Sequence, residues 1–204
     1  MFAQVIQAKT NDPDAVLERM EEWDRSVKPG AQGFLGSTAG VSDTGELIAI
    51  ARFESEEAAR RNSDRPEQSE WWAGMEKLLD GDARFYDSTE VEILFDGGSD
   101  AAGFVQVIQG RIRNADDKER WARMEAEAEG WMRENRPDLI GSVRVWQDLS
   151  FTDVIYFTSE EEARAGEKKM QESGGGEHPD GGDWAEQVDD LKFIDLRKPF
   201  FSSP

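Results

Sequence analysis

The chain has 204 residues, with 24 Lys and Arg against 44 Asp and Glu, so its formal net charge is -20; it has no cysteine and one histidine. The absence of thiols excludes disulfides, a cysteine nucleophile and sulfur-based metal sites, and the single His178, in a Gly-rich stretch, does not support a His-based triad or metal centre. The negative charge disfavours binding to nucleic acid or an anionic membrane surface, and no apolar run approaches the roughly 18 residues of a membrane span, so we expect a cytoplasmic protein.

An internal repeat organises the chain. The segment FAQVIQ at residues 2–7 recurs as FVQVIQ at residues 104–109, with five identities in six positions. Three further pairs of segments match in the same order: 19–21 with 123–125, 35–37 with 140–142, and 53–60 with 157–164. Self-similarity of this kind indicates a duplicated structural unit. We predict four segments: a repeat at 1–96, a linker at 97–102, a second repeat at 103–198 and a tail at 199–204.

The first repeat begins with a strand and a helix. Residues 2–9 follow a short strand pattern rather than that of a secretory leader. The sequence Asn-Asp-Pro-Asp at 11–14 then supplies a helix cap with proline in the first turn. An apolar stripe at helical spacing follows, and the second repeat carries a matching stripe, so we expect both to be core. The stripes are Val16, Met20, Trp23 and Val27, and Trp121, Met124, Ala128 and Trp131.

The rest of each repeat adds a hairpin, a helical segment and a closing strand. Residues 34–40 and 46–53 are predicted strands around a turn at 42–45. Residues 56–79 are predicted to be helical with a break near Pro66, and residues 84–95 to form the closing strand. In the second repeat the hairpin strands are 140–147 and 151–157. The order is strand, helix, strand, strand, helix, strand, which is the ferredoxin-like α+β arrangement with helices on one face of an antiparallel sheet.

Each predicted sheet needs cover on both faces. In the first strand Phe2 and Ile6 point one way and Ala3 and Val5 the other, so both faces carry apolar side chains. Two fused repeats can supply this cover if their sheets pack into a closed α+β barrel. We therefore expect a monomeric pseudo-dimer, for which further dimerisation stays open. The recurring amides Gln4 and Gln106 are expected to have an architectural role.

One segment resembles a known family. The sequence RFESEEAARRNSDRPEQ at 52–68, followed by Trp71 and Trp72, is similar to the antibiotic biosynthesis monooxygenase-like proteins, which are dimeric α+β barrels. In that family an aromatic residue ends a strand, a Ser-x-Glu-Ala helix start follows, and a short polar stretch with a Pro precedes a Trp. Through the repeat, the resemblance extends to nearly the whole chain.

The resemblance implies cofactor-free oxidation of aromatic compounds, haem degradation, or a protein without activity. Cofactor-free oxygenases activate a phenolic or quinol-like substrate as an anion, in an apolar pocket with a few polar groups. The positions implied for this role are Asn62, Trp72, Arg84 and Tyr86, with no cofactor and no metal. Arg84 and Tyr86 share a strand face by alternation. Haem degradation is disfavoured because His178 does not lie on a predicted helix.

The second repeat departs from this pattern. Asn62 aligns with Gly166, Arg84 with Lys192 and Tyr86 with Ile194, and only Trp72 keeps a counterpart, Trp184. The predicted site is therefore in the first repeat, although the second repeat's Arg144, Trp146 and Tyr156 offer a different pocket. Each nominated residue also has a plain structural explanation, as a helix cap, a core aromatic or a surface partner of carboxylates.

Two functions follow from these observations. The first is an antibiotic biosynthesis monooxygenase-like protein with a small apolar or aromatic ligand, acting as a cofactor-independent monooxygenase on a phenolic or quinol-like compound. The alternative is a non-enzymatic protein of the same fold that binds a metabolite or a partner. Turnover distinguishes them, because only the first consumes oxygen.

Overall fold

The computed structural model describes residues 1–172 and 188–204, and it contains two compact units. The first unit comprises Met1–Val91 with Leu196–Pro204, and the second comprises Glu92–Asp195. The predicted roles of His178 and Trp184 lie outside the described residues. Within the described part of the chain, no helix has the length and apolar character needed to cross a membrane.

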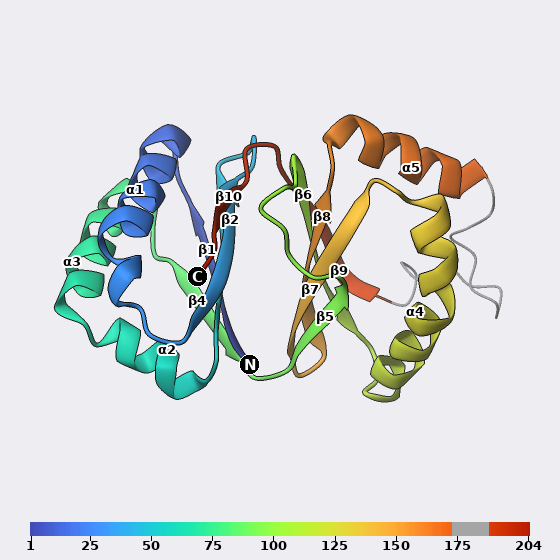
Figure 1. The fold of residues 1–204 in the computed structure, drawn as a ribbon, viewed down its shortest axis with the longest axis horizontal. Coiled ribbons are helices and arrows are strands. Elements are labelled where there is room, and N and C mark those ends of the chain that lie inside the picture. Colours follow the sequence, from blue (N-terminus) through green and yellow to red (C-terminus); the bar gives the residue numbers. More distant parts are fainter. Residues whose placement is uncertain (173–187) are drawn as a thin grey trace. The chain divides into compact units, whose positions relative to one another are not determined.

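The first unit is a five-stranded sheet with its helices on one face (Figure 1). The strand order is β10-β2-β3-β1-β4. The elements in chain order are β1 (Phe2–Lys9), α1 (Pro13–Ser26), β2 (Phe34–Val41), β3 (Glu46–Phe53), α2 (Glu56–Ser63), α3 (Pro66–Met75), β4 (Arg84–Ser88) and β10 (Phe200–Ser202), with 3₁₀ turns at Lys28–Gly30 and Glu76–Leu78.

Local signals in the sequence begin and end these elements as predicted. The Asp12 side chain accepts a hydrogen bond from the backbone N–H of Ala15 at 3.1 Å and caps α1, with Pro13 in its first turn. In the β2–β3 hairpin, Gly45 has a φ of 77°, and a Cβ there would lie 2.5 Å from the Thr10 carbonyl oxygen. Glycine is therefore required at this turn.

Two apolar clusters join the first sheet to its helices. One contains Phe2, Phe34 and Phe53 packed on the α2 residues Ala58 and Ala59. The other joins α1, α3 and the middle of the sheet through Val16, Met20, Ala39, Leu47 and Met75. The predicted stripe on the first helix is therefore core, and Phe2 marks the helix-covered face of β1.

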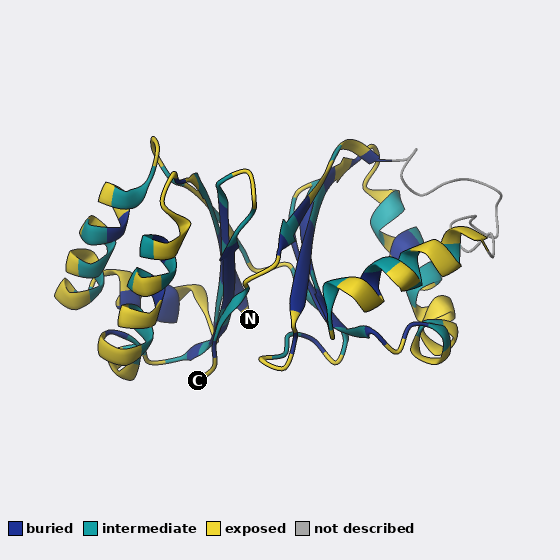
Figure 2. Ribbon diagram, turned by 90° about the horizontal axis from the view of Figure 1, so that it is seen from above, coloured by how far each residue is buried: buried dark blue, intermediate teal, exposed yellow. Residues whose placement is uncertain are grey.

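The second unit repeats this architecture. Its sheet has the order β5-β7-β8-β6-β9, and α4 and α5 lie on one face (Figure 1). The elements are β5 (Val91–Phe95), β6 (Phe104–Ile112), α4 (Asp116–Asn135), β7 (Leu139–Gln147), β8 (Ser150–Phe157), α5 (Glu160–Glu172) and β9 (Val188–Leu196). Figure 2 shows buried residues along the strands and exposed ones on the outer sides of the helices. The predicted α+β class and the duplication are confirmed.

The structure differs from the predicted closing strand and tail. The run 84–95 is divided by a turn in which the Ser88 hydroxyl accepts a hydrogen bond from the Glu90 backbone N–H at 3.0 Å. As a result β4 joins the first sheet and β5 joins the second. The predicted tail at 199–204 contains a strand, β10, which pairs antiparallel with β2 in the first sheet.

The predicted apolar stripe on the second repeat's first helix is only partly correct. Trp121 is buried, but Ala128 is exposed and Trp131 is 43% exposed. Trp121 and Glu125 are one helical turn apart and therefore lie on the same side of α4. Glu125 forms an ion pair with Arg144 of the sheet, so α4 contacts the sheet here through charged groups, where the pattern predicts apolar residues.

The C-terminal strand is fastened to α1 by a charged contact, which gives a pH prediction. Partial burial of Asp24 raises its pKa, but the Lys28 ammonium and the Ser202 hydroxyl outweigh this effect, so the net shift is below the usual value of 3.8. A lowered pKa stabilises the fold above the unfolded-state value, and this stabilisation is lost as the pH falls through the folded-state value. We expect Asp24→Asn to lower the free energy of unfolding by about 0.5 kcal/mol at pH 7 and by progressively less below pH 3.8. Urea unfolding at several pH values measures this, and an equal cost at pH 3 and pH 7 would contradict it.

Candidate functional site

Asn62 is buried in a polar network between α1, α2 and α3. Its amide nitrogen donates to the Gln68 side-chain oxygen at 3.3 Å, and its own oxygen accepts from Arg65 Nη1 at 3.0 Å. The same Gln68 oxygen accepts from Trp23 Nε1 at 2.7 Å, and Arg65 also reaches the Val27 carbonyl oxygen at 3.0 Å. Both ends of the Asn62 amide are therefore engaged within the protein.

Trp72 lies in α3 beside other aromatic rings. Its ring centroid is 5.1 Å from that of Phe85 and 6.1 Å from that of Trp71. Its indole N–H donates to Glu76 Oε1 at 2.9 Å. Trp72 therefore packs over the helix-covered face of β4 at the edge of the sheet.

Arg84 and Tyr86 point to the other face of the sheet. The register pairs Phe85 with Ile6, and Asp87 with Gln4, on the same face as Phe2. Arg84 and Tyr86 therefore share the opposite face, as predicted, and Arg84 is exposed. The four predicted site residues do not converge on one point of the first unit, and their joint catalytic role stays a prediction.

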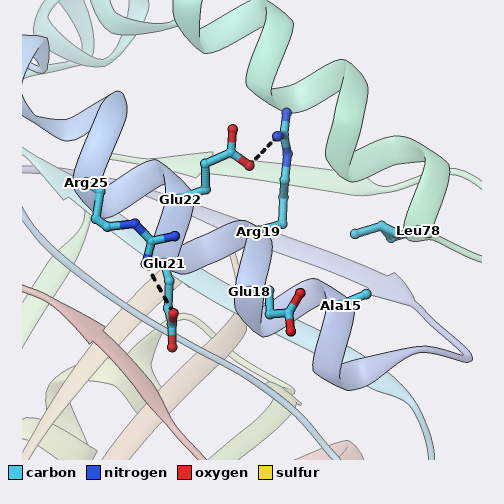
Figure 3. A pocket seen from close by; sticks show the side chains of 7 residues that line it. All are labelled: Ala15, Glu18, Arg19, Glu21, Glu22, Arg25 and Leu78. Atoms are coloured by element: carbon cyan, nitrogen blue, oxygen red, sulfur yellow. Dashed lines mark hydrogen bonds and ion pairs between the residues drawn. The ribbon is translucent and has the colours of Figure 1, made fainter.

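The hollow in Figure 3 does not contain these residues. It has a volume of about 640 Å³ and lies along α1, lined by Ala15, Glu18, Arg19, Glu21, Glu22, Arg25 and Leu78. Figure 3 shows Arg19 joined to Glu22 and Arg25 to Glu21, so four of the five charged side chains pair with each other, and Glu18 is drawn without a partner. Charged side chains dominate this lining, so the surface lacks the apolar lining of a binding site for an aromatic compound.

The recurring glutamines have matching partners in the two units. Gln4 Nε2 donates to Asp87 Oδ1 at 2.8 Å, and Gln106 Nε2 donates to Asp195 Oδ1 at 3.0 Å. Each pair joins the first strand of its repeat to the closing strand beside it. The repeated amides therefore connect strands, which agrees with the predicted architectural role.

A buried charged cluster occupies the sheet–helix layer of the second unit. Its centre is Arg144 of β7, whose side chain is 6% exposed. Arg144 Nη2 lies 2.6 Å from Glu125 Oε1 of α4 and 2.7 Å from Asp153 Oδ2 of β8, and Nη1 lies 3.4 Å from Glu92 Oε2 of β5. Asp153 also accepts a hydrogen bond from the Ser142 hydroxyl. One guanidinium thus faces three carboxylates.

Two indole rings border the same guanidinium. The Arg144 Cζ atom is 5.7 Å from the ring centroid of Trp121 and 5.8 Å from that of Trp146. These rings also pack against Phe151, with centroid distances of 5.3 and 5.5 Å. Arg144 Nε is buried and has no hydrogen-bond partner among the described residues. Buried donors are nearly always paired, so this N–H is an exception within the cluster.

The cluster shifts the proton affinities of its members. Burial raises the pKa of Glu125, and the repulsion from Asp153 and Glu92 adds to this, while Arg144 lowers it; the net shift is upward. Burial lowers the pKa of Arg144, but Asp153 and Glu125 outweigh it, so the guanidinium stays charged. Glu125 and Glu92 are 33% and 39% exposed, so the cluster reaches the surface through these two side chains.

The first unit has apolar residues at the corresponding positions. The cross-strand pair Arg144 and Asp153 aligns with Ala39 and Ala49, which face each other in the same way. The three aromatic residues correspond to apolar ones in the first repeat: Leu17, Val41 and Leu47 pack there with the two alanines. The charged cluster is therefore specific to the second repeat and is not needed to build the fold.

Part of this cluster was predicted from the sequence, but the way its members come together was not. The structure brings Arg144 and Trp146 together, whereas Tyr156 lies on the opposite face of β8, beside Gly98. Asp153 and Glu125 complete the cluster but were not among the residues predicted from the sequence. The available signal was that Arg144 and Asp153 occupy facing positions of a predicted hairpin whose neighbouring residues are apolar. Within the described ranges, no group of acidic residues or histidine is arranged to hold a metal ion.

The fold and this site define a duplicated α+β protein with a buried charged cluster in one of its two repeats. No family model matches the sequence, and no curated protein matches it. Solved structures do match over the whole chain. A proposed monooxygenase from Lactobacillus acidophilus is 12% identical, with a TM-score of 0.71 over 99% of this chain and 95% of that one. A proposed monooxygenase from Fusobacterium nucleatum is 10% identical, with a TM-score of 0.74 over 99% and 94%.

A third structure is an anthrone oxidase-like protein, which is 11% identical with a TM-score of 0.59 over 100% of this chain and 94% of that one. Identities this low establish the fold and not the activity. Over its whole length the chain thus shares the duplicated α+β fold of these structures, and the resemblance found in the sequence is confirmed at the level of the fold.

Proposed function

We propose that the protein is a cofactor-independent monooxygenase that binds a small phenolic or quinol-like compound at the charged cluster of the second unit. The observation that carries this proposal is the buried Arg144, which lies beside two indole rings and has one N–H with no hydrogen-bond partner in the described part of the chain. Indole faces suit a flat aromatic ring, and a fixed donor suits an oxygen that becomes negative during the reaction.

The chemistry needs no reductant besides the substrate. In an anthrone-type compound the reacting CH₂ group loses both hydrogens and gains one oxygen atom from O₂, while the second oxygen atom leaves as water. The substrate supplies four electrons, and O₂ accepts all four. The protein's part is to bind the ring, exclude bulk water and stabilise the anion from which the electrons leave.

We expect Trp121→Leu to raise the KM for anthrone about tenfold, because the variant loses one aromatic face against the ligand ring. The aligned residue of the first repeat, Leu17, packs in the corresponding helix–sheet layer, so we expect a leucine at position 121 to leave the fold intact. Oxygen uptake measured with anthrone tests this. Trp131→Leu is the matched control, because Trp131 lies on the same helix and is exposed.

The same assay separates the two candidate sites and the two functions. If Asn62→Ala or Arg84→Ala abolished oxygen uptake in a folded protein while Trp121→Leu had no effect, the first-repeat prediction would replace this one. Anthrone that binds without oxygen consumption would favour the non-enzymatic alternative. That alternative is supported by the separation of the four first-repeat residues on two faces of the sheet.

A further inference from the structure

We propose that Glu125 accepts a proton from the substrate, and that the site for this reason selects aromatic compounds that arrive neutral with an ionisable hydroxyl, or as the keto form of such a compound, and rejects those that carry a carboxylate. This inference rests on the proposed function, and it adds the substrate's charge class and a catalytic residue.

The charge balance of the cluster is the first argument. Arg144 contributes one positive charge, whereas Glu92, Glu125 and Asp153 are three carboxylates within 3.4 Å of its nitrogens. The formal sum of these four groups is -2 when all three carboxylates are ionised, and it is -1 with Lys118, whose Nζ lies 4.7 Å from the ring centroid of Trp146. Charges of the same sign repel strongly where side chains are shielded from water, so a ligand carboxylate would be disfavoured in this layer. A neutral hydroxyl has no such penalty.

Of the three carboxylates, Glu125 is the best placed to take a proton. Both oxygens of Asp153 are engaged, by Ser142 and by Arg144, and both oxygens of Glu125 are engaged by Arg144, at 2.6 and 3.0 Å. The two carboxylates differ in exposure, because the Asp153 side chain is only 9% exposed. Glu92 makes a longer contact with Arg144, at 3.4 Å. Glu125 lies one helical turn from Trp121 on the same side of α4, is one third exposed, and has a raised pKa because of its burial.

The proton transfer leaves Arg144 able to stabilise its product. In a phenol the O–H bond breaks, and in anthrone a C–H bond of the CH₂ group breaks. The proton moves to a Glu125 oxygen, and the bonding electrons remain on the ligand as an anion whose charge is delocalised onto its oxygen, an aryloxide. Glu125 becomes neutral as the ligand becomes negative, so the total charge of the site does not change. The guanidinium then faces the aryloxide in place of the Glu125 charge, through the Nη1 and Nη2 donors that engage Glu125.

Calorimetric titration with 1-naphthol and 1-naphthoate at pH 7.5 tests the selection. The two probes share a ring system and differ in charge. We expect the wild-type protein to bind 1-naphthol at least about tenfold more tightly than 1-naphthoate, and Glu125→Gln to bring the two affinities within about threefold of each other. Glu21→Gln should leave the ratio unchanged, because Glu21 is the aligned residue of the first repeat and pairs with Arg25 at the surface.

Turnover tests the proton transfer separately. We expect Glu125→Gln to lower kcat for anthrone by about 100-fold or more with little change in KM, since the amide keeps the shape but cannot accept the proton. A residue that only supported the fold would change kcat and KM together, or the circular dichroism spectrum.

The outcomes distinguish the inference from the proposed function. If 1-naphthol bound to the wild-type protein and lost affinity in Trp121→Leu, but Glu125→Gln kept the wild-type selectivity and kcat, Glu125 would not be the acceptor and the site would stand. If neither probe bound to the wild-type protein, both the site and this inference would fail.

Discussion

Arg144→Met is expected to lower the free energy of unfolding by about 3–5 kcal/mol, because it leaves Asp153 as a buried carboxylate without a cation. The Asp153 side chain is 9% exposed, and its Oδ2 lies 2.7 Å from Arg144 Nη2. Chemical denaturation followed by circular dichroism measures the change. Arg84→Met is the matched control, because Arg84 is exposed and its loss should cost less than about 0.5 kcal/mol.

The double variant Arg144→Met with Asp153→Leu shows whether the charges or the packing set the stability. Buried ion pairs contribute little beyond well-packed apolar residues, so removing both charges should restore part of the stability that Arg144→Met loses. The first repeat supports this expectation, because its aligned pair Ala39 and Ala49 packs without charge. A double variant less stable than Arg144→Met would show that the cluster is structurally required.

Gly166→Asn is expected to lower the free energy of unfolding by a similar amount, about 3–5 kcal/mol, although the aligned residue of the first repeat, Asn62, is an asparagine. A Cβ at Gly166 would lie 2.3 Å from Arg136 Nε. Arg136 and Asp138 form a buried ion pair in which Nη2 and Oδ2 are 2.6 Å apart and both side chains are 6% exposed. The new side chain must displace Arg136, which separates the two buried charges.

Gly130→Ala is the control for this effect. Gly130 lies in α4, and a Cβ there would meet no atom within 4 Å. Alanine favours a helix over glycine, so the variant should gain about 0.5–1 kcal/mol. If both glycine variants changed stability in the same direction, the space around Arg136 would not be the cause.

The two repeats build the same corner with different residues. In the first unit Arg65 reaches from the end of α2 to Asn62 and to the Val27 carbonyl oxygen. In the second unit Arg136 reaches from the end of α4 to the space above Gly166. The alignment of Asn62 with Gly166 is therefore explained by packing, because each residue accommodates the arginine of its own repeat.

Most of the fold could be predicted from the sequence, because its signals are local. The Asp12 cap, the Gly45 turn and the strand alternation of β1 each depend on a few neighbouring residues, and the repeat presents most of the pattern twice. These signals determine where helices and strands begin and end. They also indicate the α+β class and the duplication.

Only the tertiary structure decided which strands share a sheet and which residues form the site. The break after Ser88 sends β5 to the second sheet, and β10 returns to the first. The three carboxylates that face Arg144 are 52, 19 and 9 residues from it along the chain, and they come from two strands and a helix. Local periodicity carries no information about such partners, because a buried charge is stabilised by groups that only folding brings within a few ångströms.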